Sequence, residues 1–239
     1  MGNSLVHDYW QAHPCAAKLA DHEQGSRAFF AEVEAAKDRL DGHERAFAEF
    51  GRWRDRDVLE VGCGVGIDTA RFARAGARIS AVDLTEAAVE LTTTLLSLDG
   101  LPGRATVADA EALPFDDASF DLVYSWGVLH HTANIERAVA EVRRVLRPDG
   151  EARVMLYCRT SVFALAVWLR QLARNRSPLP MRAALATGLE SPGTRAFSRT
   201  DARSLFAGFR HVEVKQVATR YDRLRLDPLG WHLLVRAEP

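Results

Sequence analysis

The sequence predicts an α/β fold built around a parallel sheet, and three observations support this. Short apolar runs alternate with helix-like segments between residues 57 and 157. The first run is followed by a glycine turn from Gly62 to Gly66, and the second run ends at Asp83. Strands and helices that alternate at this spacing are typical of βαβ units with right-handed crossovers. We therefore expect a single sheet with helices on its faces.

The elements of this core follow from their hydrophobic patterns. Strands are expected near residues 57–61, 78–83, 104–108, 120–125 and 151–157, and helices near 66–75, 86–98 and 135–146. The last of these helices is strongly amphipathic, because Ile135, Val139, Val142 and Leu146 recur at helical spacing among charged residues. Its apolar face should pack on the sheet.

The flanking segments have patterns of their own. Residues 14–50 predict two or three helices laid over the carboxyl edge of the sheet, with breaks at Gly25 and Gly42. Residues 161–173 predict an apolar helix, and residues 199–206 predict a short helix with Thr200 as its N-cap. Two strands near 211–218 and 231–237 follow.

The glycine turn and Asp83 predict a ligand that contains a nucleoside. The carboxyl ends of parallel strands form the ligand crevice of open α/β sheets. In that crevice the glycine turn would bring a ligand against bare backbone, and the Asp83 carboxylate would bind a ribose diol. A dinucleotide fingerprint needs a small residue three places after Gly64, but Ile67 stands there, which argues against a pyrophosphate. The alternative for Asp83 is a cap on the following helix.

Four more segments follow the turn in a fixed order. They are Ala108–Phe115, Ser119–Ser125, Val128–His131 and Glu141–Gly150. With Glu60 and the glycine turn, they resemble the successive motifs of the class I S-adenosylmethionine (SAM)-dependent methyltransferases, in the small-molecule branch. The resemblance covers roughly residues 55–160. Its one departure is Asp149, where the family usually has glycine, at an expected surface turn.

The resemblance implies the topology. The sheet should be Rossmann-like, seven-stranded and mostly parallel, with the order 3-2-1-4-5-7-6, the last strand antiparallel, and an N-terminal helical lid. It also implies a single domain over residues 1–239, with a lid (1–50), a SAM-binding core (55–158), an insertion forming part of the substrate pocket (160–198) and a closing helix and strands (199–239).

SAM is the cofactor that the resemblance implies, with S-adenosylhomocysteine as product. Glu60 would lie near the methionine ammonium, Asp109 would accept the adenine amino group, and the N–H of Ala110 would meet the adenine ring. The expected cofactor-binding residues are Glu60, Gly62, Gly64, Gly66, Asp83, Leu84, Asp109, Ala110, Ser125 and Trp126. The alternatives are a solvated charge for Glu60, a helix N-cap for Asp109 and core packing for Trp126.

His130 and His131 are the expected catalytic residues, because an imidazole that titrates near pH 7 takes a proton from a hydroxyl or ammonium acceptor. A purely structural role for the pair stays open, since the family carries it with different acceptors. Tyr9, Trp10 and His130 are expected in the substrate pocket, with lid packing as the alternative for the two aromatic residues. No metal site is expected, because no second cluster of ligands accompanies His13.

Composition narrows the class of protein. The 239 residues, 47% of them hydrophobic, are enough for one large core, and no apolar run is long enough to span a membrane. The net charge of −1 provides no broad basic surface, so neither nucleic acid nor a membrane is an expected partner. Three cysteines without metal spacing and a first segment unlike a signal peptide favour a cytoplasmic protein. We expect a monomer or homodimer.

The expected reaction is direct displacement, in which an oxygen, nitrogen or carbon nucleophile of a small metabolite takes the methyl group of SAM, in secondary metabolism. Proximity, orientation and exclusion of water are enough for this step. Two alternatives stay open. The same pocket could catalyse a non-methylating displacement or cyclisation, because a fold does not fix the chemistry. A nicotinamide-dependent oxidoreductase is the other, and Ile67 and the later motifs disfavour it.

Overall fold

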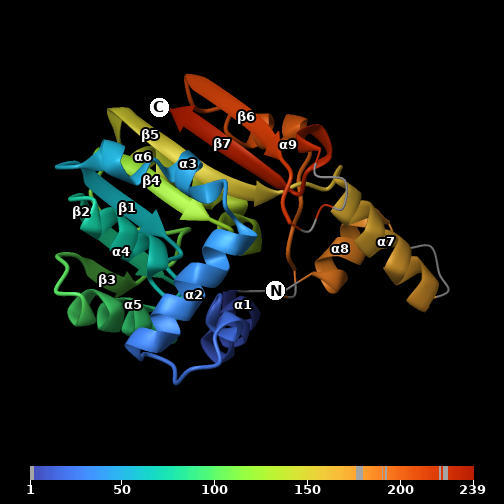
Figure 1. Cartoon of the computed structure of the whole chain (residues 1–239). Helices are drawn as coiled ribbons and strands as arrows, with labels where there is room; N and C mark the ends of the chain where they lie inside the picture. The colour runs from blue at the N-terminus through green and yellow to red at the C-terminus, as the bar shows by residue number, and fades with distance from the viewer. Residues whose placement is uncertain (1–2, 176–179, 190, 192, 221, 223–225) are drawn as a thin grey trace.

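A seven-stranded sheet forms the centre of the computed structural model, which describes residues 3–175, 180–189, 191, 193–220, 222 and 226–239 (Figure 1). Its strands are β1 (Asp57–Val61), β2 (Arg78–Asp83), β3 (Arg104–Val107), β4 (Phe120–Trp126), β5 (Leu146–Tyr157), β6 (His211–Val217) and β7 (His232–Glu238). The order is β3-β2-β1-β4-β5-β7-β6. Strands β1 to β5 are parallel, and β7 is antiparallel to β5 and β6. The predicted sheet order and antiparallel last strand are confirmed.

Helices cover both faces of the sheet. One face carries α6 (Ile135–Val145) and α9 (Arg199–Leu205); the other carries α3 (Glu44–Ala48), the 3-10 helix η2 (Phe50–Trp53), α4 (Ile67–Arg74) and α5 (Glu86–Leu98). Successive strand residues point to opposite faces. Leu59 and Val123 therefore join the core on the α6 side, whereas Val58 and Leu122 join the core on the α4 side.

Strand β5 begins earlier than the pattern predicts. It starts at Leu146 rather than near residue 151, and its pairing with β4 shifts register between Phe120 and Leu122. Asp149 is exposed within this irregular start of the strand, and not in a turn between a helix and a strand.

The N-cap of α9 also differs from the prediction. The Ser198 hydroxyl accepts a hydrogen bond from the N–H of Asp201 (3.1 Å), and the Asp201 carboxylate accepts one from the N–H of Ser198 (2.8 Å). This reciprocal pair is a capping box. The prediction of Thr200 as the cap was wrong, because the helix already begins at Arg199.

The N-terminal segment lies across the carboxyl edge of the sheet (Figure 1). It consists of α1 (Asn3–Ala12), which precedes the predicted helical range, the 3-10 helix η1 (Ala17–Leu19) and α2 (Arg27–Leu40). Ser26 caps α2 by accepting from the N–H of Phe29 (3.1 Å). Phe29, Phe30 and Val33 pack against apolar side chains of α4 and α5, so α2 is anchored to the core.

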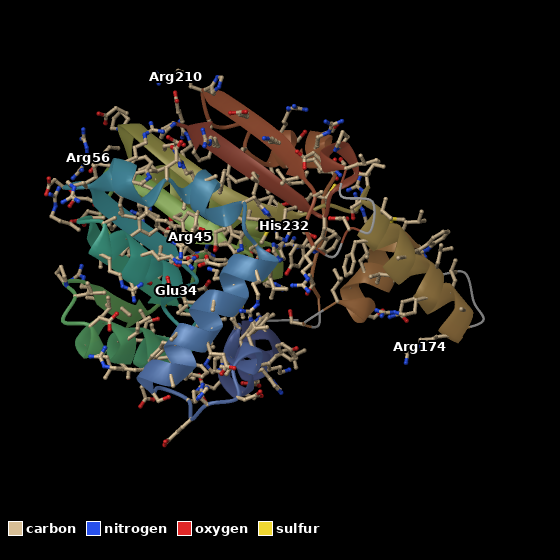
Figure 2. The ribbon with its side chains drawn as sticks, in the orientation of Figure 1. Glu34, Arg45, Arg56, Arg174, Arg210 and His232 are labelled. Carbon is tan, nitrogen blue, oxygen red and sulfur yellow. The ribbon has the colours of Figure 1, made fainter. Side chains whose placement is uncertain are left out.

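The insertion forms two helices beside the same edge, α7 (Val162–Asn175) and α8 (Met181–Gly188) (Figure 1). The remaining short elements are the 3-10 helices η3 (Leu129–His131) and η4 (Asp227–Leu229). Arg56, Arg174 and Arg210 are exposed at the rim, whereas His232 lies where the C-terminal end of α2 meets the sheet (Figure 2). Within the described ranges, none of the helices has the length and apolar character needed to cross a membrane.

Candidate active site

A cavity of about 610 Å³ lies at the carboxyl edge of the sheet. The ends of β1, β2, β4 and β5 form one side of it, and α1, η1 and α2 form the other. Most of the residues expected to bind the cofactor line it: Glu60, Gly62, Gly64, Asp83, Leu84, Asp109, Ala110 and Trp126. Gly66 and Ser125 are not among the lining residues.

The three glycines of the turn serve different purposes. All have positive φ, 84° at Gly62, 53° at Gly64 and 85° at Gly66, a conformation that favours glycine. A Cβ on Gly62 would lie 2.2 Å from a methyl group of Val128, and one on Gly66 would lie 2.8 Å from the Cα of Thr92. Those two glycines therefore permit close packing. Gly64 lines the cavity, and a ligand there would meet its bare backbone.

Asp83 is held by hydrogen bonds at both carboxylate oxygens. Oδ2 accepts from the N–H of Gly64 (3.0 Å), and Oδ1 accepts from the N–H (3.1 Å) and hydroxyl (3.0 Å) of Thr85. The N-cap of α5 is Thr85, so Asp83 is not that helix's cap. Burial raises the pKa of Asp83, while these N–H donors lower it. Oδ2, which accepts one of these three bonds, keeps a lone pair for a further donor such as a ribose hydroxyl.

Glu60 is a buried carboxylate on the cavity wall, and not a solvated charge. The hydroxyl of Thr69 donates to its Oε2. Burial, aided by the negative charge of Asp68, raises the pKa of Glu60 to about 8. A cation beside Glu60 would favour the ionised form.

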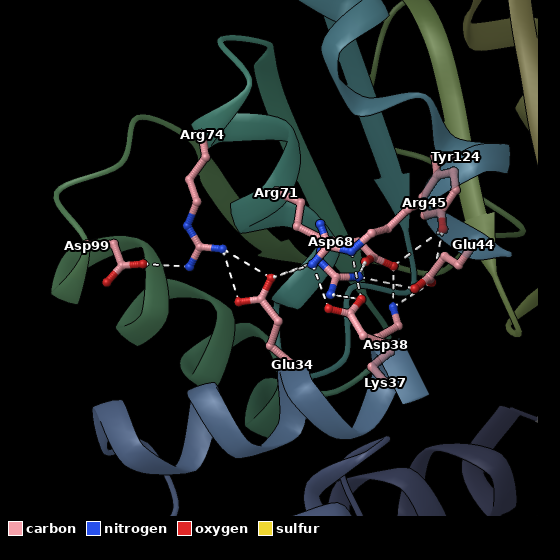
Figure 3. Close-up of polar contacts among 10 residues, drawn as sticks. All are labelled: Glu34, Lys37, Asp38, Glu44, Arg45, Asp68, Arg71, Arg74, Asp99 and Tyr124. Atoms are coloured by element: carbon pink, nitrogen blue, oxygen red, sulfur yellow. Dashed lines mark hydrogen bonds and ion pairs between the residues drawn. The ribbon is translucent and has the colours of Figure 1, made fainter. Parts of the chain in front are cut away.

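A network of charged side chains joins the lid to the core (Figure 3). The charges of two of its members, Asp68 and Lys37, act on Glu60. Lys37 of α2 pairs with Asp68 of α4 and with Glu44 of α3, at 2.7 Å between Lys37 Nζ and Glu44 Oε1. Arg71 Nη1 lies 3.2 Å from Asp68 and 3.3 Å from Glu44, and the Tyr124 hydroxyl donates to Glu44 (3.2 Å). Although burial alone would lower it, the two carboxylates raise the pKa of Lys37. Lys37 and Asp68 also line the cavity.

At the end of β3, Asp109 Oδ1 accepts a hydrogen bond from the N–H of Glu111 (2.9 Å). A turn and not a helix follows it, so Asp109 is not a helix N-cap. At the end of β4, the Ser125 hydroxyl donates to the carbonyl of Val61 (3.0 Å) and is buried, so this side chain ties β4 to β1. Trp126, next in the chain, reaches the cavity.

The two histidines differ in position. His131 lines the cavity, and its Nδ1 lies 2.9 Å from the Ser191 hydroxyl and 3.1 Å from that of Thr194. His130 is not among the lining residues; its ring lies 4.0 Å from that of Tyr157, and neither of its nitrogens has a hydrogen-bond partner among the described residues. Burial lowers the pKa of His131 to about 3 and that of His130 well below its ordinary value. The expected titration near pH 7 is therefore not found.

Aromatic side chains surround the part of the cavity beyond Trp126. Tyr9 and Trp10 of α1 line it, and the Trp10 ring lies 5.3 Å from that of His131. Tyr157 stacks on Trp231 with ring centroids 4.5 Å apart, and Phe163 of α7 lies 4.9 Å from Trp231. Sequence reasoning missed Tyr157 and Trp231, whose only signal was an aromatic residue at the end of the fifth strand and one before the seventh. Phe163 belongs to the insertion that was expected to form part of the pocket, although it was not named as a site residue.

Comparisons with known proteins identify similar sequences and structures. The methyltransferase domain family matches residues 59–154. The uncharacterized methyltransferase YcgJ of Bacillus subtilis is 31% identical over 126 residues, which are 52% of this chain and 50% of that protein. The chain spans about half or less of the length of the curated relatives it matches.

Solved structures share the fold. A protein from Pyrococcus horikoshii has a TM-score of 0.66 at 18% identity, over 97% of this chain and 98% of that one. The [4+2]-cyclase SpnF has a TM-score of 0.62 at 17% identity, over 99% of this chain and 93% of that one. Identities this low show the common architecture alone, and a fold hosts more than one chemistry.

Proposed function

Because this chain belongs to the class I SAM-dependent methyltransferase family, we propose that it binds SAM in the cavity and transfers the methyl group to a small-molecule acceptor. One observation carries the proposal. Asp109, the Asp83-bound glycine turn and Glu60 follow one another along a single wall, and an aromatic chamber lies beyond Trp126. A nucleoside with an attached amino acid matches that order of groups.

Two features of the wall fit SAM. Gly64 lines the cavity and has no side chain, which allows a ligand to approach its backbone closely. Glu60 is a buried carboxylate on the same wall, and a buried carboxylate is stabilised by a cationic partner. The ammonium of the methionine moiety is such a cation.

The side chains then have distinct tasks. Asp109 and the N–H of Ala110 bind the adenine, Asp83 and the neighbouring Leu84 hold the ribose, and Glu60 and Trp126 contact the methionine portion. Lys37, which lines the cavity beside Glu60, is placed to bind the methionine carboxylate. Bound SAM supplies a methyl group already activated by its sulfonium, so the protein's part is to orient the acceptor and exclude water.

The chamber favours an acceptor with an apolar or aromatic body. Trp10, Tyr157, Phe163 and Trp231 form much of its wall, and rings of this kind bind flat apolar groups by burial and stacking. His131 stays neutral near pH 7, because burial lowers its pKa to about 3. It therefore positions the acceptor by a hydrogen bond more readily than it stores a proton.

The proposal also covers the cellular compartment, the oligomeric state and the partners of the protein. The chain has three cysteines without metal spacing, a pattern that favours a reducing compartment. We place the protein in the cytoplasm, as a monomer or homodimer that acts on secondary metabolites, without a nucleic-acid or membrane partner. The net charge of −1 supports the last point.

Calorimetry with SAM, S-adenosylhomocysteine and NAD tests the binding step. We expect micromolar binding of the first two and none of NAD. Incubation of a panel of apolar and aromatic hydroxyl and amine compounds with methyl-labelled SAM then tests transfer, read as labelled product and S-adenosylhomocysteine. Binding of NAD in place of SAM would refute the proposal. Conversion of an acceptor without consumption of bound SAM would identify a non-methylating enzyme instead.

A further inference from the structure

Three potential metal ligands meet at the edge of the cavity, beside Trp126. Asp41 is the C-cap of α2, His43 is the N-cap of α3 and His232 is the first residue of β7. One ligand atom of each lies within 4.8 Å of the other two. Asp41 and His232 line the cavity, and the His232 and Trp126 rings lie 5.6 Å apart. The cluster therefore borders the aromatic chamber.

The spacing fits binding to a common ion. His43 Nε2 lies 3.1 Å from His232 Nδ1. Two imidazole nitrogens at about 2.0–2.1 Å from one ion, with an angle between the right angle and the tetrahedral value, are roughly 2.9–3.4 Å apart. A ligand atom of Asp41 lies within 4.8 Å of these nitrogens, so its carboxylate would have to move closer to bind the same ion.

The simpler reading is a hydrogen bond between the two imidazoles, with 3.1 Å between His43 Nε2 and His232 Nδ1. That reading does not involve the Asp41 carboxylate, whereas a shared ion would account for the approach of all three groups.

We propose that Asp41, His43 and His232 form a binding site for a divalent first-row transition ion. Two histidines and one carboxylate are a donor set typical of zinc and non-haem iron sites that keep open positions for water or substrate. Those positions would face the chamber. There the ion would bind and polarise an oxygen or nitrogen of the acceptor, a role that rests on the proposed function. The sequence prediction of no metal site does not hold under this proposal.

Metal titration of the tag-free protein, dialysed against a chelator and without SAM, tests the site. We expect Zn²⁺ to bind with one equivalent by calorimetry, and Co²⁺ to show the visible absorption of a nitrogen-ligated ion. Asp41→Asn and His43→Gln should each weaken Zn²⁺ binding at least tenfold and remove the Co²⁺ spectrum. The matched control is His22→Gln, which removes an exposed histidine 2.8 Å from Glu32 and should change neither.

His232 is buried, so His232→Gln is included only if its circular dichroism and melting temperature match those of the unchanged protein. The proposal is wrong if Zn²⁺ and Co²⁺ do not bind, if binding survives both Asp41→Asn and His43→Gln, or if His22→Gln removes it equally. SAM is absent from the titration, so these outcomes do not depend on whether the proposed methyl transfer is correct.

Discussion

The backbone N–H of Gly64 donates a 3.0 Å hydrogen bond to Oδ2 of Asp83, which fixes the turn after β1 against the end of β2. The residue proposed to bind ribose thus also shapes the backbone proposed to meet the rest of the ligand. Because Thr85 occupies the other oxygen, the carboxylate is oriented before a ligand arrives. Preorganisation of this kind reduces the entropic cost of binding.

Replacing Asp83 should therefore remove its hydrogen bonds to SAM and also loosen the glycine turn, and both changes weaken SAM binding. We expect Asp83→Ala to weaken affinity roughly 10- to 100-fold, because a hydrogen bond to a charged group contributes about 1.5–3 kcal/mol. Calorimetry with SAM measures this, and Asp149→Ala, which removes an exposed aspartate, is the control. Unchanged affinity in a folded Asp83→Ala protein would rule out the ribose assignment.

Two glycines of the turn should respond differently to alanine. Gly66→Ala places a Cβ 2.8 Å from the Thr92 backbone, so we expect it to destabilise the fold by about 1–3 kcal/mol. Gly64→Ala has room, with its nearest neighbour Cys15 at 3.4 Å, and should cost about 1 kcal/mol for its backbone conformation while weakening SAM binding more. Urea unfolding and calorimetry separate the effects. The prediction is wrong if the ratio of lost SAM affinity to lost stability is the same in Gly64→Ala and Gly66→Ala.

Glu60 should make cofactor binding dependent on pH. With its pKa raised to about 8, Glu60 holds a proton at pH 7, and an ammonium placed beside it favours the carboxylate. Binding of S-adenosylhomocysteine, which carries that ammonium, should release a proton at pH 7 and fewer protons as the pH rises past 8. Its affinity should increase between pH 7 and pH 8, because less proton release is then needed. Calorimetry in buffers of different ionisation enthalpy counts the protons. Glu60→Gln should release none, and identical proton release in that variant would assign the proton to another group.

The same carboxylate opposes folding as the pH rises. Unfolded Glu60 loses its proton near its ordinary pKa of 4.5, whereas folded Glu60 keeps it until about pH 8. The folded state therefore loses stability between those values. Glu60→Gln should remove this loss, which is a second readout for the pKa.

Lys37 should be essential to the junction between lid and core (Figure 3). Lys37→Met leaves Asp68 and Glu44, both buried, without one of their cations, and breaking a buried pair in this way costs about 3–5 kcal/mol. Glu44→Gln in the same chain should recover part of the loss. Arg45→Met, which removes an exposed partner of Asp38, should have little effect in urea unfolding. Equal loss from Lys37→Met and Arg45→Met would show that the network does not stabilise the junction.

Local patterns were sufficient to locate the strands and helices of the core, whereas the order of the strands came from the resemblance to a known family. Glu60, Asp83 and Asp109 could be placed at the cavity because they lie near strand ends that the hydrophobic runs define. Local patterns could not identify Lys37, since its approach to Asp68, 31 positions away, depends on how α2 packs on α4. Tyr157 and His232 become neighbours only through the antiparallel pairing of β5 and β7.

Adjacent residues are also hard to separate by sequence. His130 and His131 share one 3-10 turn, η3, and its orientation places His131 on the cavity and His130 behind it. Ser125 and Trp126 alternate across β4, so the serine reaches β1 and the tryptophan reaches the cavity. The motif locates each pair, but the direction of each side chain depends on the packed structure.

The lid should matter more for turnover than for cofactor affinity. Tyr9 and Trp10 line the chamber, and residues 3–20, which the structure describes in this segment, contribute no strand to the sheet. We expect deletion of residues 1–20 to leave a folded protein with modestly weaker SAM binding and little or no methyl transfer, because the chamber then opens to water and the acceptor is no longer oriented. Trp10→Ala should also lower methyl transfer more than SAM affinity, but to a lesser degree. The control is Leu5→Ser, at a residue that is 55% exposed, which should leave both measurements unchanged. Full turnover by the shortened chain on its own acceptor, with SAM saturating, would show that α1 does not close the site.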